Sequence, residues 1–166
     1  MKLEIGCGEK QRKYGYKTCD IRCLPNVDFC CNAIDLDKHI KENTVTHIYA
    51  RHFMEHLTFF ETDIFLKVLR KILKPTGEVE IIVPNMAYHI NQWINRKNDR
   101  KQFTHAKAGF WGWQRGKNDN YWDVHKSGHD KDTIKELIHK HKFINFRSKN
   151  DENNPHLHVF FYKDKE

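Results

Sequence analysis

The chain has 166 residues, with 29 Lys and Arg against 22 Asp and Glu, which gives a formal net charge of +7. This length provides one packed core but no separate recognition domain, so we expect a single domain over residues 1–166. A content of 39% hydrophobic and 13% aromatic residues excludes a disordered chain. No apolar run reaches the roughly 18 residues of a membrane span, and residues 1–4 are already strand-like, so we expect neither a membrane partner nor a signal peptide.

Apolar segments of strand length alternate with helical patterns along the chain. Residues 61–73 place apolar side chains at i, i+3 and i+4, which predicts an amphipathic helix that stops at residues 74–77. Asp130 and Asp132 predict the start of another helix. We expect strands at residues 2–7, 17–21, 27–31, 46–50, 78–83, 143–147 and 157–162. This alternation predicts an α/β fold, in which residues 78–83 are buried on both faces of a mostly parallel sheet.

Two glycines follow the first predicted strand, in the sequence Gly6-Cys7-Gly8, and Asp20 lies twelve residues after the second glycine. Glycine pairs also form ordinary turns, but these two allow φ > 0 and a close approach to a ligand. A carboxylate at Asp20 can accept both hydroxyls of a ribose. The third glycine of a dinucleotide site is replaced by Gln11, and no phosphate-binding loop occurs. The pattern favours a nucleoside without phosphates, of which S-adenosylmethionine (SAM) is the commonest.

The connection between the first two predicted strands is short, because only about eight residues separate Gly8 from residue 17. A three-turn helix, which normally follows the first strand of a doubly wound fold, does not fit. We expect a short turn or no helix there. Cofactor binding should therefore depend on the backbone of the glycine loop and on Asp20, rather than on a helix amino end.

Several stretches follow one another in the order found in a known family. They are Leu3-Glu4-Ile5-Gly6-Cys7-Gly8, Gly15-Tyr16-Lys17-Thr18-Cys19-Asp20-Ile21, Ile48-Tyr49-Ala50-Arg51-His52-Phe53-Met54-Glu55-His56-Leu57, and Leu69-Arg70-Lys71-Ile72-Leu73-Lys74-Pro75-Thr76-Gly77 with Ile82-Val83-Pro84-Asn85. In these motifs the chain resembles the small class I SAM-dependent methyltransferases, over residues 2–85 and again at 125–143. The resemblance implies a Rossmann-like sheet with an antiparallel last strand, methyl transfer from SAM, and S-adenosylhomocysteine as product.

The resemblance also implies a set of cofactor-binding residues. Glu4 would organise the glycine loop through hydrogen bonds, although it could also be a solvated acid. Asn32 stands before Ala33 where related sequences carry Asp, so an adenine contact would keep a carbonyl acceptor and lose the charge. The full set of expected cofactor contacts is Glu4, Gly6, Cys7, Gly8, Asp20, Ile21, Asn32, Ala33, Ala50, Arg51 and His52.

Cysteines and histidines raise the question of a metal. No Cys-x2-Cys pair occurs among the five cysteines, which are Cys7, Cys19, Cys23, Cys30 and Cys31. We expect reduced, buried thiols and a cytoplasmic protein, with zinc as the alternative.

Residues 52–56 match the His-x-x-Glu-His motif of inverted zinc metallopeptidases. That motif needs a long helix, whereas this stretch directly follows a predicted strand. We therefore expect no metal, and we expect His52 and His56 to be packing residues if they are not functional.

Residues 86–129 hold all four tryptophans and carry eight Lys and Arg against three Asp, which accounts for +5 of the net +7. A segment of this length exceeds what a connection requires. We expect a partly helical cap that forms the acceptor pocket, with Arg115 and Lys117 as contacts if the acceptor is anionic. The alternative is a satellite core that shields one face of the sheet.

The acceptor is the least defined part of the prediction. A basic, aromatic cap is compatible with nucleic acid, but the proline-rich loop of base-amine methyltransferases is absent at residues 50–53. We expect a small anionic or sugar-like acceptor that is methylated at oxygen. The alternatives are an RNA or other nucleic-acid methyltransferase, a non-catalytic SAM-fold binding subunit, and a SAM-consuming enzyme that is not a transferase. His52 and His125 are the candidate bases, because the pKa of an imidazole is near neutral, and each could instead be structural.

Overall fold

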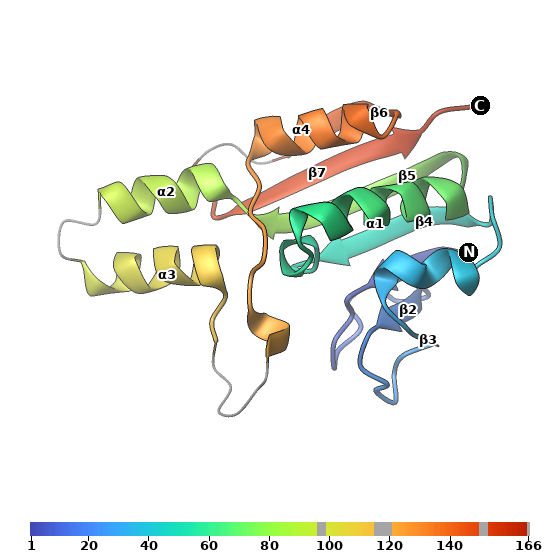
Figure 1. Ribbon diagram of the computed structural model, residues 1–166, viewed down its shortest axis with the longest axis horizontal. Helices are drawn as coiled ribbons and strands as arrows, with labels where there is room; N and C mark the ends of the chain where they lie inside the picture. The colour runs from blue at the N-terminus through green and yellow to red at the C-terminus, as the bar shows by residue number, and fades with distance from the viewer. Residues whose placement is uncertain (96–98, 115–120, 150–152, 166) are drawn as a thin grey trace.

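The computed structural model describes residues 1–95, 99–114, 121–149 and 153–165. Its sheet has seven strands in the order β3-β2-β1-β4-β5-β7-β6 (Figure 1). The strands are β1 (Lys2–Ile5), β2 (Lys17–Asp20), β3 (Phe29–Cys30), β4 (Val45–Arg51), β5 (Leu73–Pro84), β6 (Phe143–Ser148) and β7 (His156–Lys163). The α-helices are α1 (Phe59–Ile72), α2 (Met86–Ile94), α3 (Arg100–Trp111) and α4 (Lys131–Lys140), and the 3₁₀ helices are η1 (Ala33–Lys38), η2 (Met54–His56) and η3 (Tyr121–Asp123).

The sheet is mostly parallel. Strands β1 to β5 pair in parallel, and β7 runs antiparallel between β5 and β6. Glu4 of β1 lies opposite Thr18 of β2 and Tyr49 of β4, so the carboxyl ends of these strands lie at one edge. The predicted α/β sheet with an antiparallel last strand is confirmed.

No helix stands between β1 and β2, as the short connection predicts, and residues 6–16 form a loop. This loop crosses one face of the sheet. The ammonium of Lys13 lies 3.0 Å from a carboxylate oxygen of Glu80 in β5 and 4.4 Å from the centre of the Tyr49 ring in β4. The hydroxyl of Tyr16 lies 3.0 Å from Nδ1 of His47, also in β4. The loop therefore covers part of a face that has no helix above it.

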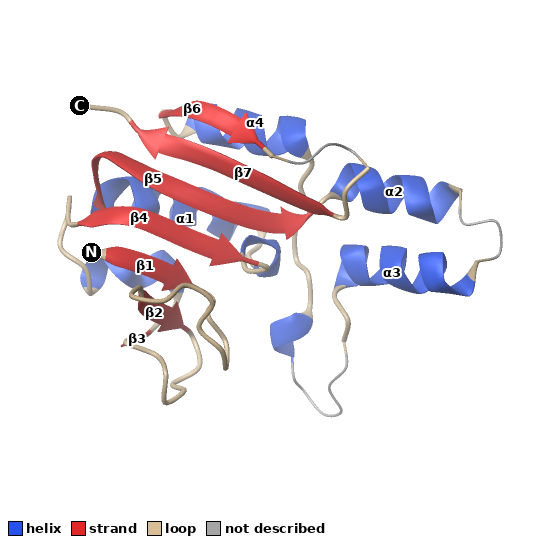
Figure 2. Ribbon diagram, turned by 180° about the vertical axis from the view of Figure 1, so that it is seen from behind, coloured by secondary structure: helices blue, strands red, loops and turns tan. Residues whose placement is uncertain are grey.

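The opposite face holds the apolar core. Figures 1 and 2 show α1 and α4 together on this face of the sheet. Helix α1 begins with a capping box between Thr58 and Glu61, and it buries Phe65, Leu69 and Ile72. Apolar side chains of β4 and β5 meet them, so the core is a single layer of helix on sheet. No helix in the described ranges is long and apolar enough to cross a membrane.

The expectation that strand 78–83 is buried on both faces is wrong. Val79, Ile81 and Val83 are fully buried and face the helices, whereas Glu78 and Glu80 alternate with them and face the other side of the sheet. The described chain places no helix on that side, which is turned toward the viewer in Figure 2. A network of polar side chains lies there instead: Nε2 of His158 lies 2.9 Å from Oε1 of Glu80, and Lys13 pairs with the other oxygen of the same carboxylate. The sequence alternates across β5 because only one face packs against apolar groups.

Helices α2 and α3 lie side by side beyond the carboxyl ends of β4 and β5 (Figures 1 and 2). The Trp93 ring contacts Phe103, Phe110 and Trp111 at centroid distances of 4.9, 5.6 and 5.6 Å. The described part of segment 86–129 is thus partly helical, and it has an aromatic cluster of its own.

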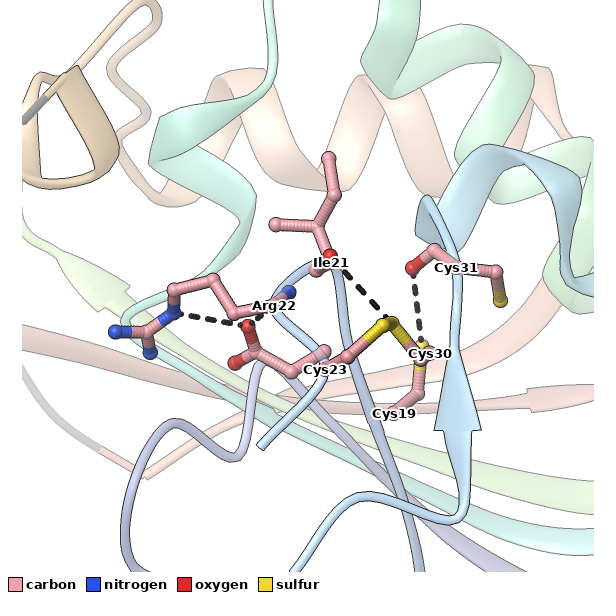
Figure 3. The surroundings of a disulfide bond; sticks show 7 residues. Cys19, Ile21, Arg22, Cys23, Cys30 and Cys31 are labelled. Carbon is pink, nitrogen blue, oxygen red and sulfur yellow. Dashed lines mark hydrogen bonds and ion pairs between the residues drawn. A yellow bond between two sulfur atoms is a disulfide. The ribbon is translucent and has the colours of Figure 1, made fainter. Parts of the chain in front are cut away.

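The expectation that all cysteines are reduced is wrong for two of them. Cys23 and Cys30 form a disulfide that closes the loop between β2 and β3 (Figure 3). Cys7, Cys19 and Cys31 are free thiols. The Cα atoms of the bonded pair lie 5.0 Å apart because β3 pairs with β2, and this proximity is not visible in a spacing of seven residues. The cysteine pattern consequently gives no support to a cytoplasmic location.

Candidate cofactor and acceptor site

The glycine turn fixes the carboxyl end of β1. The backbone amides of Gly6 and Cys7 donate to the carbonyl of Cys19 at 2.8 and 3.3 Å. Gly6 has φ = 67°, and a Cβ atom at this position would lie 2.7 Å from the ring of Phe53. Only glycine meets both conditions, because other residues disfavour this backbone conformation and would push Phe53 away.

Glu4 lies beneath the turn and is 2% exposed. Its carboxylate accepts hydrogen bonds from the backbone amides of Arg12 at 3.0 Å and Lys13 at 2.9 Å. Loop 6–16 is therefore folded around a buried acid. Glu4 is not among the described residues that line the two cavities below, and it contacts the loop rather than either cavity.

Asp20 ends β2 and points its carboxylate at the glycine loop. One oxygen accepts from the amide of Gly8 at 2.8 Å, and the other accepts from the amide and Nε of Arg22 at 3.0 and 3.1 Å. Burial acts to raise the pKa of Asp20, but the bonds from Arg22 and Gly8 outweigh it, so the pKa is lowered and the group is ionised. A carboxylate has about four acceptor positions, so a ribose with two hydroxyls would have to displace one bond from Arg22.

A first cavity, of about 100 Å³, opens beside these groups at the ends of β1, β2 and β3. Five of the predicted cofactor residues line it: Gly6, Asp20, Ile21, Asn32 and Ala33. The cavity is also lined by residues that were not predicted as cofactor contacts, among them Phe53, His56, Leu57, Trp122 and Lys126. The first three follow β4 within the stretch that resembles the family, so the sequence could have indicated that they line the cavity. The last two belong to segment 86–129, and nothing in the sequence pattern places them there.

Asn32 has a second role at this cavity. Its side-chain oxygen accepts from the amide of Ile34 at 3.3 Å and caps helix η1. An amide oxygen has two lone pairs, so one acceptor position is left for a ligand amine. The weaker adenine contact that the sequence implies is compatible with this geometry.

The other predicted cofactor residues do not line the first cavity. Cys7 and Ala50 are buried, and burial raises the pKa of the Cys7 thiol to about 11. Gly8 contributes its amide to Asp20, and Arg51 ends β4. His52 lines a different cavity.

This second cavity, of about 410 Å³, lies between the end of β4 and the α2–α3 cap. It is lined by six histidines, which are His52, His56, His89, His105, His125 and His156, together with Glu55 and Trp113. His56 lines both cavities, so they meet at this residue. The structure therefore brings the two predicted bases, His52 and His125, into one cavity although they are far apart in the sequence.

Three of these histidines are oriented by defined contacts. Nδ1 of His56 lies 3.0 Å from the carbonyl of Val124, and Nδ1 of His125 lies 2.9 Å from the carbonyl of Gly109. Because a carbonyl only accepts, both Nδ1 atoms carry the proton and both Nε2 atoms offer a lone pair. His52 has φ = 49°, which is unusual for a residue with a side chain, and its Nδ1 lies 3.2 Å from Glu55 Oε1.

Burial keeps several imidazoles neutral. It lowers the pKa of His125, of His156, and of His89, for which the pKa falls to about 4. A neutral imidazole both donates and accepts hydrogen bonds, so this cavity suits hydroxyl groups as well as anions.

Two tryptophans of the cap line the cavities, one in each. Trp113 lines the second cavity and Trp122 lines the first. Trp111 instead joins the aromatic cluster with Trp93 and is about half exposed. Arg115 and Lys117, the predicted contacts to an anionic acceptor, lie outside the described residues.

Comparisons with known proteins agree with this fold. No family model and no curated protein matches the sequence. The structure is similar to the CurJ carbon methyltransferase (TM-score 0.64, 12% identity, covering 98% of this chain but only 48% of that one). It is also similar to a SAM-dependent methyltransferase from Archaeoglobus fulgidus (0.64, 16%, 98% and 85%). A third similar structure is the 1,6-didemethyltoxoflavin-N1-methyltransferase of Burkholderia thailandensis with its substrate and S-adenosylhomocysteine bound (0.62, 12%, 98% and 70%). The chain therefore has the fold of the class I SAM-dependent methyltransferases, the family that its sequence motifs resemble.

Proposed function

We propose that this protein transfers a methyl group from SAM to a hydroxyl oxygen of a small, sugar-like or anionic acceptor. The observation that carries the proposal is the meeting of two chemically different cavities at His56. One cavity has the glycine turn and the ribose-binding carboxylate of a nucleoside site, and the other is lined with imidazoles. A transfer between two bound molecules needs this adjacency, because the reacting atoms must come within about 3 Å of each other.

The residues of the first cavity fit the adenosine part of SAM. Asp20 is an ionised acceptor for the ribose, while Ile21 and Ala33 offer apolar contacts to a base. The volume of about 100 Å³ lies below the roughly 300–1,000 Å³ of typical ligand sites. Binding of the whole cofactor therefore requires the cap side chains Trp122 and Lys126 to move away from the sheet.

The chemistry is a displacement at carbon. Bound SAM supplies a methyl group on a positively charged sulfur. The acceptor oxygen provides the electron pair of the new O–C bond, the C–S bond breaks with its pair left on sulfur, and the hydroxyl proton passes to a base. His125 Nε2 and the His52 imidazole are the candidate bases, since both line the second cavity.

Three features support a small, hydroxyl-bearing acceptor. The second cavity, at about 410 Å³, has the size of a small-molecule site. Its neutral imidazoles match alternating donors and acceptors, and Trp113 offers a flat apolar surface of the kind that packs on a sugar ring. One similar structure, the didemethyltoxoflavin methyltransferase, holds a small molecule as its substrate.

Calorimetry tests the cofactor part of the proposal. The protein should bind both SAM and S-adenosylhomocysteine, whereas a non-catalytic subunit that has lost the site binds neither. Tritiated SAM offered to pools of sugars, small hydroxylated acids and RNA then identifies the acceptor. Label that enters RNA alone would replace the small-molecule proposal, and consumption of SAM without any acceptor would replace the transferase.

A further inference from the structure

Glu55 is a buried acid with an unusual environment. It belongs to η2, directly after β4, and is 1% exposed. One carboxylate oxygen contacts Nδ1 of His52, but Oε2 is a buried atom that finds no hydrogen-bond partner within the described part of the chain. Leaving a carboxylate oxygen buried and unpaired is strongly unfavourable, so a cation or donor that the described residues do not provide is expected to face it.

Two histidines converge on this carboxylate. A potential ligand atom of Glu55, one of His56 and one of His125 all lie within 4.8 Å of one another. The two imidazole rings meet edge to face with their centroids 5.1 Å apart. In both rings Nδ1 is held by a backbone carbonyl, of Val124 and of Gly109, which leaves the lone pair of Nε2 for a ligand. Metal-binding histidines commonly have this second hydrogen bond, because it fixes the tautomer.

The backbone holds the three residues together. The amides of Lys126 and Ser127 both donate to the carbonyl of Glu55, at 2.8 and 3.1 Å. The strand-like segment that carries His125 is therefore anchored directly to η2. This arrangement differs from the His-x-x-Glu-His motif, in which both histidines come from one helix. Here His125 takes the place of His52, and His52 only contacts the carboxylate of Glu55.

We propose that Glu55, His56 and His125 bind a first-row divalent transition-metal ion. Two imidazoles and one carboxylate form the ligand set of catalytic zinc and of non-haem iron(II) sites, in which further positions stay open. Two ligands in a tetrahedral zinc site lie about 3.4 Å apart, so side-chain shifts of about 1 Å would close the set around the ion. This site contradicts the expectation that no metal is bound, which rested on the lack of a ligand set with the spacing of a known zinc motif.

The position of the site suggests what the ion does, and this part rests on the proposed function. His56 lines both cavities, so the ion would lie between cofactor and acceptor. A hydroxyl of the acceptor that occupies an open position gives up its proton more readily, since the cation stabilises the resulting negative charge. His125 then serves as a ligand, and His52 is the remaining base.

Cobalt(II) is the probe for the site, because its visible absorption reports the number and kind of ligands. Protein freed of metal by dialysis against a chelator should bind one equivalent of Co²⁺, and Zn²⁺ should displace it. Glu55→Gln and His125→Ala should weaken Co²⁺ binding at least tenfold. His125→Cys should keep the ion and add a cobalt–thiolate charge-transfer band. His105→Ala is the matched control, because His105 lines the same cavity outside the ligand set and should bind Co²⁺ like the parent.

Calorimetry with SAM and the melting temperature show whether each variant is folded. The proposal is overturned if the folded parent binds no stoichiometric Co²⁺, or if Glu55→Gln and His125→Ala bind it as tightly as the parent. It is also overturned if His125→Cys binds the ion without the thiolate band. The proposed function fails separately: a parent that binds Co²⁺ through these residues but methylates no hydroxyl acceptor keeps the metal site and loses the oxygen transfer. Full transfer rates in the metal-free protein would remove the ion from the reaction.

Discussion

The two cavities differ in how the chain builds them. The first is formed mostly where β1, β2 and β3 end, and its key groups come from residues 6–33. The second gathers residues from the stretch that follows β4, the end of β5, α2, α3, the segment at 123–125 and the start of β7. A sheet brings the ends of parallel strands together by its topology, whereas the second cavity exists only when the cap packs over the sheet. The first cavity is thus a local property of the sequence, and the second is a property of the fold.

Among substitutions that affect one cavity and not the other, Gly6→Ala is expected to have the largest effect. A side chain at φ = 67° is strained by about 1–2 kcal/mol, and the new Cβ would also lie 2.7 Å from Phe53. We expect SAM binding to fall more than a hundredfold in calorimetry. Gly15→Ala is the matched control: Gly15 has φ = 76°, but a Cβ there would meet no atom within 4 Å. Equal losses in both variants would mean that backbone strain alone, and not the contact with Phe53, limits the turn.

Asp20→Ala should weaken SAM binding by about 1.5–3 kcal/mol, as for other charged hydrogen bonds. The change removes the ribose acceptor and the bond to the amide of Gly8. Asp35→Ala is the control, because Asp35 is an exposed acid at η1 that pairs with Lys38. Unchanged affinity in Asp20→Ala would show that the first cavity does not hold the ribose.

Trp113→Ala tests the second cavity in the same way. We expect turnover to drop ten- to a hundredfold through poorer positioning of the acceptor, while SAM affinity stays within about threefold of the parent. Trp111→Ala should lower the melting temperature and leave the kinetics intact, since Trp111 packs against Trp93 and Phe110. If both variants lose stability and SAM binding together, the cap is only a satellite core.

The smallest effect is a dependence of stability on pH. The pKa of His89 is lowered to about 4 by burial and by the nearby His105, His156 and His125. The unfolded chain, with an ordinary pKa near 6.5, therefore binds more protons as the pH falls. Stability should decrease by about 1–2 kcal/mol between pH 7 and pH 5. Thermal unfolding of His89→Gln should show a shallower decrease, and an identical slope would place the proton uptake elsewhere.

The sequence predicted the sheet because its strands and glycine turn obey local rules. Gly6, Asp20 and Asn32 lie at the first cavity because Gly6 directly follows β1, Asp20 ends β2 and Asn32 comes soon after β3. His52 was singled out beside the cofactor and His125 in a family string, and the structure places both in the second cavity.

What the sequence did not show are contacts between distant segments. The unpaired oxygen of Glu55 depends on the burial of η2 beneath segment 124–129, and no periodicity reports burial of a single polar atom. The Cys23–Cys30 bond depends on the pairing of β2 with β3. The sheet face on which the described residues form no helix follows from the missing first helix. The alternation of polar and apolar residues in β5 was not recognised, because the strand is rich in β-branched residues.

That helix-free face has a thermodynamic consequence. Glu80 of β5 is paired there with Lys13 and His158, so unfolding this side transfers charged and polar groups to water. Apolar exposure raises the heat capacity of unfolding, whereas polar exposure lowers it. A sheet with one apolar face should consequently have a smaller heat-capacity increment per residue than a sheet covered by helices on both sides. Its stability curve should be flatter, so the protein gives up some maximal stability in exchange for a wider temperature range in which the sheet stays folded.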